Sequence, residues 1–285
     1  MQITTLIENH AACSGEGLVA EHGLSLHIDH GGKQILFDTG ASGSFAANAL
    51  KLGIDLDRVD AAVLSHHHYD HGGGLEAFFA VNHHAPVYLR DPPEGEPYFK
   101  ALSVVSRPIG LPGSLLDNFA ERFVYLDAFT EILPSIFIFT KIPRQFDSPR
   151  GNRHIYLKQG KRYVHDSFSH ELLMALRVKD GLVVLTACSH SGVLNMIQAV
   201  RDRFPQERIK AVIGGFHLLG IPLLNTLADS KTAVIELGRA LQELPVDHYW
   251  TGHCTGDRAF TLLQGVLGDS LSALRTGARL SIAQE

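Results

Sequence analysis

The chain has 285 residues, a formal net charge of −5 and 45% hydrophobic residues. This apolar content is enough to fill a buried core, and the lack of a basic stripe argues against a nucleic-acid partner. Three irregularly spaced cysteines do not form a disulfide framework, and no apolar run is long enough to span a bilayer. The N-terminus has no basic segment followed by an apolar one. We therefore expect a cytoplasmic protein with no membrane partner, whose partner is a small-molecule substrate.

Histidine is the one abnormal feature of the composition. The chain contains 17 histidines, several of them in tight groups. Because histidine is the commonest metal ligand among side chains, this excess favours a metal site.

The first third of the chain has the pattern of strands separated by tight turns. Residues 61–64 are wholly apolar, as expected of a strand covered on both faces. Two glycines at 31–32 predict a hairpin turn. The expected strands are 2–7, 24–28, 34–37 and 61–64, and the expected helices are 44–52 and a segment that begins near residue 75.

Residues 91–165 are rich in proline and glycine and mix aromatic with basic residues. We interpret this segment as an insertion near the active site. The regular pattern then resumes, with expected strands 172–178, 182–186, 209–213 and 248–251 and expected helices 193–203 and 232–244. Two batches of strands, each followed by helices, predict an α/β fold in one domain over residues 1–285. Its two sheets pack face to face inside a four-layer αββα sandwich.

The strand at 61–64 is followed by the motif His66-x-His68-x-Asp70-His71 and three glycines. On extended backbone His66 and His68 point the same way and can approach one metal ion. Asp70 and His71, past the bend, can face a second metal ion. Imidazole and carboxylate are ligands of zinc-type sites, and two adjacent ions can share a hydroxide. The motif predicts a dinuclear metal site, and a surface histidine-rich loop is the alternative.

This motif, together with Ile-Leu-Phe-Asp-Thr-Gly at 35–40, resembles the metallo-β-lactamase superfamily. The resemblance implies the metallo-β-lactamase form of the αββα sandwich, in which Asp38 buttresses the metal loop. Further motifs look like the branch labelled dihydropterin-ribofuranosylaminobenzene-phosphate synthase-like. They are Glu-His-Gly-Leu-Ser-Leu at 21–26, Thr-Ala-Cys-Ser-His-Ser-Gly at 186–192, Gly-Gly-Phe-His-Leu at 214–218 and Thr-Gly-His-Cys-Thr-Gly at 251–256.

Each metal ion needs at least one more protein ligand. His190 and His253 each follow an apolar strand, so both can reach a site at the strand ends. We assign His190 to the ion of His66 and His68, and His253 to the second ion. The expected cofactors are two divalent ions, zinc or alternatively manganese or iron. We group His217 with Asp70 as catalytic, with His217 either a ligand or a proton donor to the substrate.

The bridge between the two ions is an open question in the sequence. Many superfamily members carry a bridging aspartate on a strand between the motifs that here hold His190 and His253. This chain has Gly-Gly-Phe-His at 214–217 instead, which leaves the ions held by a hydroxide alone or more loosely. Cys188, two residues before His190, is another ligand candidate or a packing residue. Asp166 is a further candidate for the site or its surroundings.

The predicted function is metal-dependent hydrolysis, with a metal-bound hydroxide attacking a small anionic substrate. The branch label implies a phosphate-containing or pterin-related compound. Lys141 and Arg144, with Lys100 and Arg107 in the same insertion, are candidates to bind the anion. A lactone or thioester hydrolase and a non-enzymatic small-ligand sensor are the alternatives. Di-iron redox relatives have glutamate in place of the second histidine of the motif, where this chain has His68.

Overall fold

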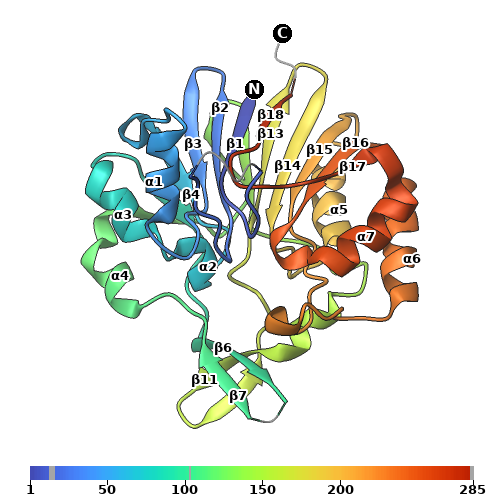
Figure 1. Cartoon of the computed structure of the whole chain (residues 1–285). Helices are drawn as coiled ribbons and strands as arrows, with labels where there is room; N and C mark the ends of the chain where they lie inside the picture. Colours follow the sequence, from blue (N-terminus) through green and yellow to red (C-terminus); the bar gives the residue numbers. More distant parts are fainter. Residues whose placement is uncertain (13–16, 103, 283–285) are drawn as a thin grey trace.

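The computed structural model describes residues 1–12, 17–102 and 104–282, and two seven-stranded sheets form its centre (Figure 1). The first sheet contains, in spatial order, β18 (Arg279–Ser281), β1 (Gln2–Ile7), β2 (Ser25–His30), β3 (Lys33–Phe37), β4 (Ala61–Val63), β5 (Val87–Leu89) and β8 (Phe123–Tyr125). The second contains β17 (Leu271–Ala273), β16 (Val246–Thr251), β15 (Ile209–Gly214), β14 (Gly181–Ala187), β13 (Leu173–Val178), β10 (Ile136–Phe139) and β9 (Thr130–Leu133).

Helices cover the outer face of each sheet, on opposite sides of the molecule (Figure 1). Beside the first sheet lie α1 (Ser44–Lys51), α3 (Leu75–Val81) and α4 (Gly113–Asn118), and beside the second lie α5 (Val193–Arg203), α6 (Lys231–Gln242) and α7 (Asp257–Leu267). Short helical turns connect them: α2 (Tyr69–Gly72), η1 (Leu56–Arg58), η2 (Ala120–Arg122), η3 (Arg150–His154), η4 (Pro222–Leu224), η5 (His253–Thr255) and η6 (Gly268–Ser270). The predicted four-layer αββα sandwich is confirmed.

Three apolar clusters correspond to the three interfaces between four layers. One lies between the two sheets, and the other two lie between each sheet and its helices. Strand β10 shows how the sequence divides between them. Ile136 and Ile138 belong to the cluster between the sheets, whereas Phe137 and Phe139 belong to the cluster under the helices of the second sheet. Because side chains alternate along a strand, a continuous apolar run is required where both faces are covered.

The segment 91–165 is divided between the sandwich and a third, smaller sheet. The small sheet has the order β12 (Arg162–His165), β11 (Ile155–Gln159), β6 (Glu96–Ala101) and β7 (Val105–Pro108), and it projects from one end of the sandwich (Figure 1). Strands β8, β9 and β10, however, belong to the two large sheets. The expectation of one continuous insertion is wrong in this respect, because the apolar run of β10 is buried on both faces.

The glycines that follow the histidine motif are required by close packing. Gly73 and Gly74 have φ values of −65° and −86°, so neither needs the left-handed region. A Cβ at Gly73 would overlap the carbonyl oxygen of Ala41, and a Cβ at Gly74 would overlap that of Thr39. The motif thus packs directly on the backbone of residues 39–42, which fixes its position relative to β3.

The two ends of the described chain lie together in the first sheet, where Gln2 of β1 is opposite Ser281 of β18. They are at the end of the sandwich that faces away from the small sheet (Figure 1). Among the residues that the structure describes, no helix combines the length and apolar character needed to cross a bilayer.

Candidate metal centre

The loop after β4 is anchored by Asp38, at the end of β3. Asp38 accepts hydrogen bonds from the Ser65 backbone N–H and hydroxyl, both at 2.8 Å, and from Nδ1 of His71 at 2.7 Å. The φ of Asp38, 59°, lies in the left-handed region, which costs energy for a residue with a side chain. Burial lowers the pKa of His71, but the charge and hydrogen bond of Asp38, together with the charge of Asp70, raise it by more, so the net pKa is raised. Asp38 therefore connects the end of β3 to Ser65 and His71 of this loop.

Three buried imidazoles converge beside this loop. One ring nitrogen from each of His66, His68 and His190 lies within 4.8 Å of the other two. Their Nε2 atoms are buried and have no hydrogen-bond partner among the described residues. Burial lowers the pKa of all three rings, that of His68 to about 3. At neutral pH these rings are uncharged, so each can offer a lone pair to a metal ion.

Neighbouring groups fix the orientation of two of these rings. Nδ1 of His66 is 2.8 Å from the Ser65 hydroxyl oxygen, and Nδ1 of His190 is 3.1 Å from the Asn152 Oδ1 atom. Donation through Nδ1 leaves Nε2 unprotonated and directed at the other two histidines. A buried nitrogen without a partner is unfavourable, and a divalent cation would satisfy all three at once. The residues present fit a metal ion.

Asp70, His71 and His253 form a second group beside the first. Nε2 of His71 is 3.2 Å from Nε2 of His253, and Nε2 of His253 is 3.4 Å from a carboxylate oxygen of Asp70. Nδ1 of His71 is bonded to Asp38, and Nδ1 of His253 is 3.1 Å from Oδ1 of Asn9. With both Nδ1 atoms donating, two lone pairs face each other. A cation between them removes that repulsion, so this group also fits a metal ion.

His22 is a site residue that the sequence analysis did not assign. Its Nε2 atom is 3.3 Å from Asp70, and His22, Asp70 and His253 form another group able to hold a metal ion. His22 follows no strand, so its place in the sequence does not mark it as a residue at a strand end. The motif at 21–26 was the available signal, because it contributed to the family resemblance.

Two buried glutamates, also missed, fix the backbone of two site histidines. Glu8 accepts the N–H of His253 at 2.6 Å, and Glu171 accepts the N–H groups of His190 and Ser191, both at 2.7 Å. Burial raises the pKa of Glu171 to about 7, against the hydrogen bonds from Ser191 and His190, which lower it. Each glutamate holds the turn that carries one histidine, and no local sequence pattern indicates this role.

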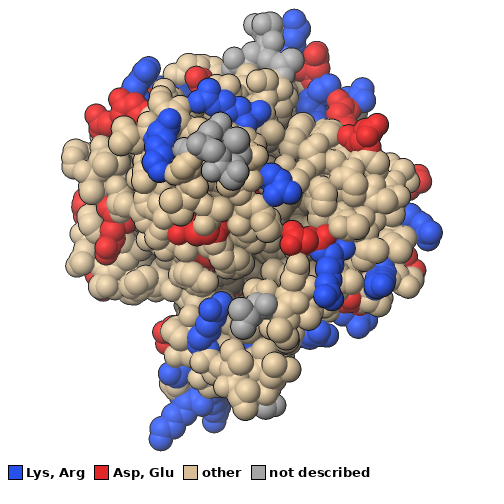
Figure 2. Space-filling model, in the orientation of Figure 1, with Lys and Arg blue, Asp and Glu red and all other residues tan. Residues whose placement is uncertain are grey.

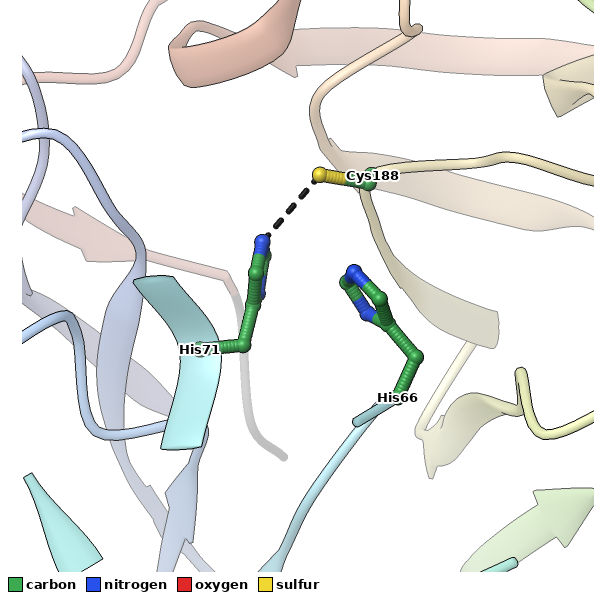
Figure 3. Close-up of side chains that lie close together, drawn as sticks. All are labelled: His66, His71 and Cys188. Carbon is green, nitrogen blue, oxygen red and sulfur yellow. Dashed lines mark hydrogen bonds between the residues drawn. The ribbon is translucent and has the colours of Figure 1, made fainter. Parts of the chain in front are cut away.

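Cys188 lies between the two histidine groups. Its sulfur is 3.1 Å from Nε2 of His71, and Figure 3 shows Cys188 and His71 directed at one another, with His66 beside them. Strand β14 ends at Ala187 and the chain then turns, so Cys188 and His190 do not lie on one face of a continuing strand. Cys188 and His190 nevertheless both reach the site.

The position of the missing aspartate is closed to any side chain. An added Cβ at Gly215 would overlap the sulfur of Cys254, and one at Gly214 would lie 2.5 Å from the Thr186 hydroxyl oxygen and 2.8 Å from the Ala187 nitrogen. These two glycines are needed for the close contact with the end of β14. A bridging carboxylate cannot come from this strand.

Asp166 supports the site from outside the histidine cluster. Its carboxylate is 3.1 Å from Nε2 of His170 and accepts the N–H of Phe168 at 2.7 Å. Nδ1 of His170 accepts the N–H of His67 at 3.2 Å. The structure therefore connects Asp166 to the backbone of the histidine motif through His170, and it gives Asp166 no direct contact with His66 or His68.

A pocket opens onto the histidine cluster between the sandwich and the small sheet. Ile155 and Phe99 reach it from one face of the small sheet, as does Arg107, whose guanidinium carbon is 5.9 Å from the centre of the Phe99 ring. His217 lies in the same wall, with its ring centre 4.1 Å from that of His190. The lining also includes His22, His68, Tyr69, Asp70, Ile109, Gly151, Cys188, Leu219, Gly220, Pro222, His253 and Cys254.

The predicted anion-binding residues are not those that line the pocket. Lys141 and Arg144 are exposed and outside the lining, and Arg144 donates to the Ser167 carbonyl. Arg107 lines the pocket instead, and Figure 2 shows Lys and Arg side chains gathered on the projecting small sheet. The prediction for Lys141 and Arg144 is corrected, because the basic residue in the pocket lining is Arg107 of β7 and not a residue of the segment after β10.

His67, unlike its two neighbours in the motif, turns away from the cluster. Its Nε2 atom donates to the Arg90 carbonyl at 2.8 Å. Burial lowers the pKa of His67 to about 4 from 6.5, against that hydrogen bond, which raises it. The unfolded chain therefore binds more protons between these two pH values. The stability that His67 contributes is present above pH 6.5 and is lost, by about 3 kcal/mol, as the pH falls toward 4.

We expect His67→Gln to flatten the acid side of the stability profile of the metal-free protein. Glutamine keeps an N–H donor for the Arg90 carbonyl but takes up no proton on unfolding. The slope of unfolding free energy against pH should fall by about 1.4 kcal/mol per pH unit between the two pKa values. Urea denaturation at a series of pH values measures this slope. An unchanged slope would show that His67 is not buried in its neutral form.

Comparison with known proteins agrees with this fold. Residues 20–135 match the family model described as the metallo-beta-lactamase superfamily. A solved structure, described as a metal-dependent hydrolase of the beta-lactamase superfamily, is 29% identical, with a TM-score of 0.82 over 100% of both chains. The Zn(2+)-bound PqqB of Methylobacterium extorquens shares the fold at 10% identity, with a TM-score of 0.56 over 99% of this chain and 100% of PqqB. The chain thus carries a match to the metallo-β-lactamase superfamily at residues 20–135 and is similar over nearly its whole length to proteins described with that fold.

One curated relative matches the branch that the motifs indicated. The chain is 28% identical over 295 residues to a 7,8-dihydropterin-6-methyl-4-(beta-D-ribofuranosyl)-aminobenzene-5'-phosphate synthase of Methanocaldococcus jannaschii. The alignment covers 97% of this chain and 95% of that protein. An uncharacterized protein of the same organism is 27% identical, over 92% of this chain and 93% of its own length. The predicted family resemblance is confirmed.

Proposed function

We propose that this protein is a metal-dependent hydrolase with two divalent metal ions, zinc or alternatively manganese or iron. His66, His68 and His190 would hold the first ion. Asp70, His71 and His253 would hold the second. The observation that carries the proposal is the convergence of three buried, unpartnered Nε2 atoms in the first group. Nitrogen and carboxylate donors in this number are typical of catalytic zinc-type sites.

The chain's own residues supply positioning and proton transfer around these ions. When bound, two divalent ions activate a water molecule as nucleophile and polarise the attacked carbonyl or phosphoryl oxygen. Asp38, Glu8 and Glu171 hold the ligand loops in place through the hydrogen bonds described above. His217 lines the pocket, and neither of its ring nitrogens has a partner among the described residues. We assign His217 the role of donating a proton to the leaving group.

We propose a small anionic substrate that carries phosphate and is related to the pterins. Tyr69 and Phe99 give the pocket aromatic faces suited to a planar ring, and Arg107 provides a guanidinium that can bind phosphate oxygens. The name of the M. jannaschii relative contains both a dihydropterin and a 5'-phosphate. That name also favours a second candidate, a synthase reaction on a pterin-related phosphate at the same site.

The test is activity after controlled metal loading. Protein stripped by a chelator and reconstituted with Zn²⁺, Mn²⁺ or Fe²⁺ is assayed on phosphodiester, lactone and thioester substrates, and for condensation of a pterin with an anionic aminobenzene riboside. We expect metal-dependent turnover of the phosphodiesters. Turnover confined to lactones or thioesters would overturn the substrate assignment, and condensation without hydrolysis would favour the synthase. Failure of the stripped protein to bind any metal would overturn the proposal as a whole.

Replacing Arg107 tests the proposed anion contact. We expect Arg107→Ala to raise the KM for phosphate-containing substrates about 10- to 100-fold, because a hydrogen bond to a charged group contributes about 1.5–3 kcal/mol. The kcat should change little, since Arg107 touches no ligand of the proposed ions. Lys141→Ala is the matched control, because Lys141 is exposed and outside the pocket. Equal effects of the two substitutions would contradict a specific role of Arg107.

A further inference from the structure

We propose that the sulfur of Cys188 bridges the two metal ions, in the position that an aspartate occupies in many superfamily members. This inference rests on the proposed dinuclear site and deepens it, because it assigns the atom that joins its two halves. Cys188 is only 3% exposed and lines the pocket that opens onto the histidine cluster.

The sulfur shares neighbours with both proposed metal groups. It forms one set of candidate ligand atoms with His66 and His71, a second with His190 and His217, and a third with His253 and Cys254. Within each set all ligand atoms lie within 4.8 Å of one another. His66 and His190 belong to the proposed first ion, and His71 and His253 belong to the second. One atom is therefore close to ligands of both ions.

Two neighbours of the Cys188 sulfur have a ring nitrogen whose lone pair no hydrogen bond uses. The Nε2 atoms of His66 and His190 are buried and lack a hydrogen-bond partner in the part of the chain that the structure describes. Both side chains are at most 1% exposed. Figure 3 shows the His66 ring beside the contact between Cys188 and His71. The thiol thus adjoins a cluster that already requires a cation.

No bridging carboxylate is available from the strand that carries it in many superfamily members, and two nearby aspartates are hydrogen-bonded to other groups. Gly214 and Gly215 admit no side chain, because an added Cβ would overlap Thr186 and Cys254. Asp38 is bonded to Ser65 and His71, on the Nδ1 side of the ring. Asp166 is bonded to His170 and Phe168. None of these acids is free to take the bridging position.

The backbone on either side of Cys188 is held in an unfavourable conformation that aims its side chain. Ala187 has a φ of 51° and Ser189 a φ of 57°, both in the left-handed region. Such conformations cost energy in residues other than glycine and persist where the surroundings enforce them. The Ser189 hydroxyl donates to the Gly215 carbonyl at 2.7 Å, which fixes this turn against the glycine pair. The strained turn points the thiol into the cluster.

The chemistry of a thiolate suits this position. On metal binding the thiol gives up its proton to solvent, and the resulting thiolate has lone pairs for two ions. A mixed nitrogen and sulfur environment selects zinc, cobalt or iron over magnesium or calcium. A sulfur bridge would also hold the two ions together without a strand aspartate.

Cobalt titration of the chelator-stripped full chain tests the bridge. A Co²⁺–thiolate bond gives a near-ultraviolet charge-transfer band that nitrogen and oxygen ligands do not give. We expect the band in the wild-type protein to grow through both equivalents of Co²⁺, because the bridge bonds to both ions. Cys188→Ser should lose the band and bind the second Co²⁺ about tenfold more weakly or worse. Cys254→Ser is the matched control, a buried cysteine in the next motif, and should keep the band.

Each other outcome has a definite meaning. A band that stops growing after one equivalent shows a terminal thiolate, and a band that persists in Cys188→Ser shows the wrong cysteine. Uptake of two equivalents without any band refutes the thiolate and leaves the proposed hydrolase intact. No uptake of Co²⁺ or Zn²⁺ refutes the proposed function as well. If Cys188→Ser does not fold, the wild-type titration still separates a bridging, a terminal and an absent thiolate, and loss of the band in Cys254→Ser would show the wrong cysteine.

Discussion

Replacing His68 by alanine is expected to remove one of two bound metal ions and to lower hydrolytic activity at least about 100-fold. The loss of a group that merely orients a metal ligand costs about 10- to 100-fold, and the loss of a ligand should cost more. The unpartnered Nε2 atom of His68 faces His66 and His190, so alanine leaves the first ion with two of its three histidine ligands. Elemental analysis of the reconstituted variant and steady-state kinetics measure the two effects.

The adjacent histidine provides the control. His67 is also buried, but its Nε2 atom donates to the Arg90 carbonyl and not toward the cluster. His67→Ala should lose stability, yet it should keep two ions per chain at neutral pH. Activity that survives His68→Ala unchanged would exclude the proposed metal chemistry. Equal metal loss in the two variants would show a general effect of unfolding the loop.

Asp38→Asn should have the second large effect, on both stability and metal affinity. The carboxylate accepts three buried hydrogen bonds from Ser65 and His71, and an amide can accept through only one of its two atoms. Breaking this buried pair should lower the free energy of unfolding by about 3–5 kcal/mol. The substitution also releases Nδ1 of His71, so the ring can carry its proton on Nε2 and lose its metal-binding lone pair. We expect the affinity for the second ion to fall about 10- to 100-fold.

Asp60→Asn on the same sheet is the matched control. Asp60 accepts hydrogen bonds from Lys33 and from the Gln34 backbone, but its side chain is 31% exposed. Asp60→Asn should lower the free energy of unfolding by at most about 1 kcal/mol, because solvent screens the ion pair with Lys33. Urea denaturation of the metal-free proteins and competition with a chromophoric chelator measure the two quantities. Similar losses at the two positions would contradict the buttressing role of Asp38.

Elements with a complete local signal could be predicted from the sequence. Strand β1 and helix α5 begin and end at the predicted residues, because strand-forming composition and helical periodicity are properties of neighbouring residues. The middle of the chain was less predictable. Strands β8 to β10 are short, and their place in the two large sheets depends on pairing with distant strands such as β13.

The candidate site likewise contains residues with a local sequence signal and residues that depend on distant contacts. The residues from His66 to His71 form one local motif. His190 and His253 could also be predicted, because each follows an apolar strand. Glu8 and Glu171 could not, because each is a single residue without a local pattern, and His22 had only the motif at 21–26 as a signal. Their roles come from contacts across the fold, such as the one between Glu8 and His253, which are 245 positions apart. Arg107 was considered with other basic residues, but sequence alone did not separate it from Lys141.

The bond between Glu8 and the backbone of His253 has a consequence for how the molecule assembles. It ties the first strand of the chain to a turn near its end, so the loop it closes includes most of the polypeptide. Closing so large a loop is slow and comes after local structure has formed. During refolding the histidine-rich loop after β4 should therefore exist before the second cation can be retained. Tight capture of that cation should coincide with the final, slowest kinetic phase.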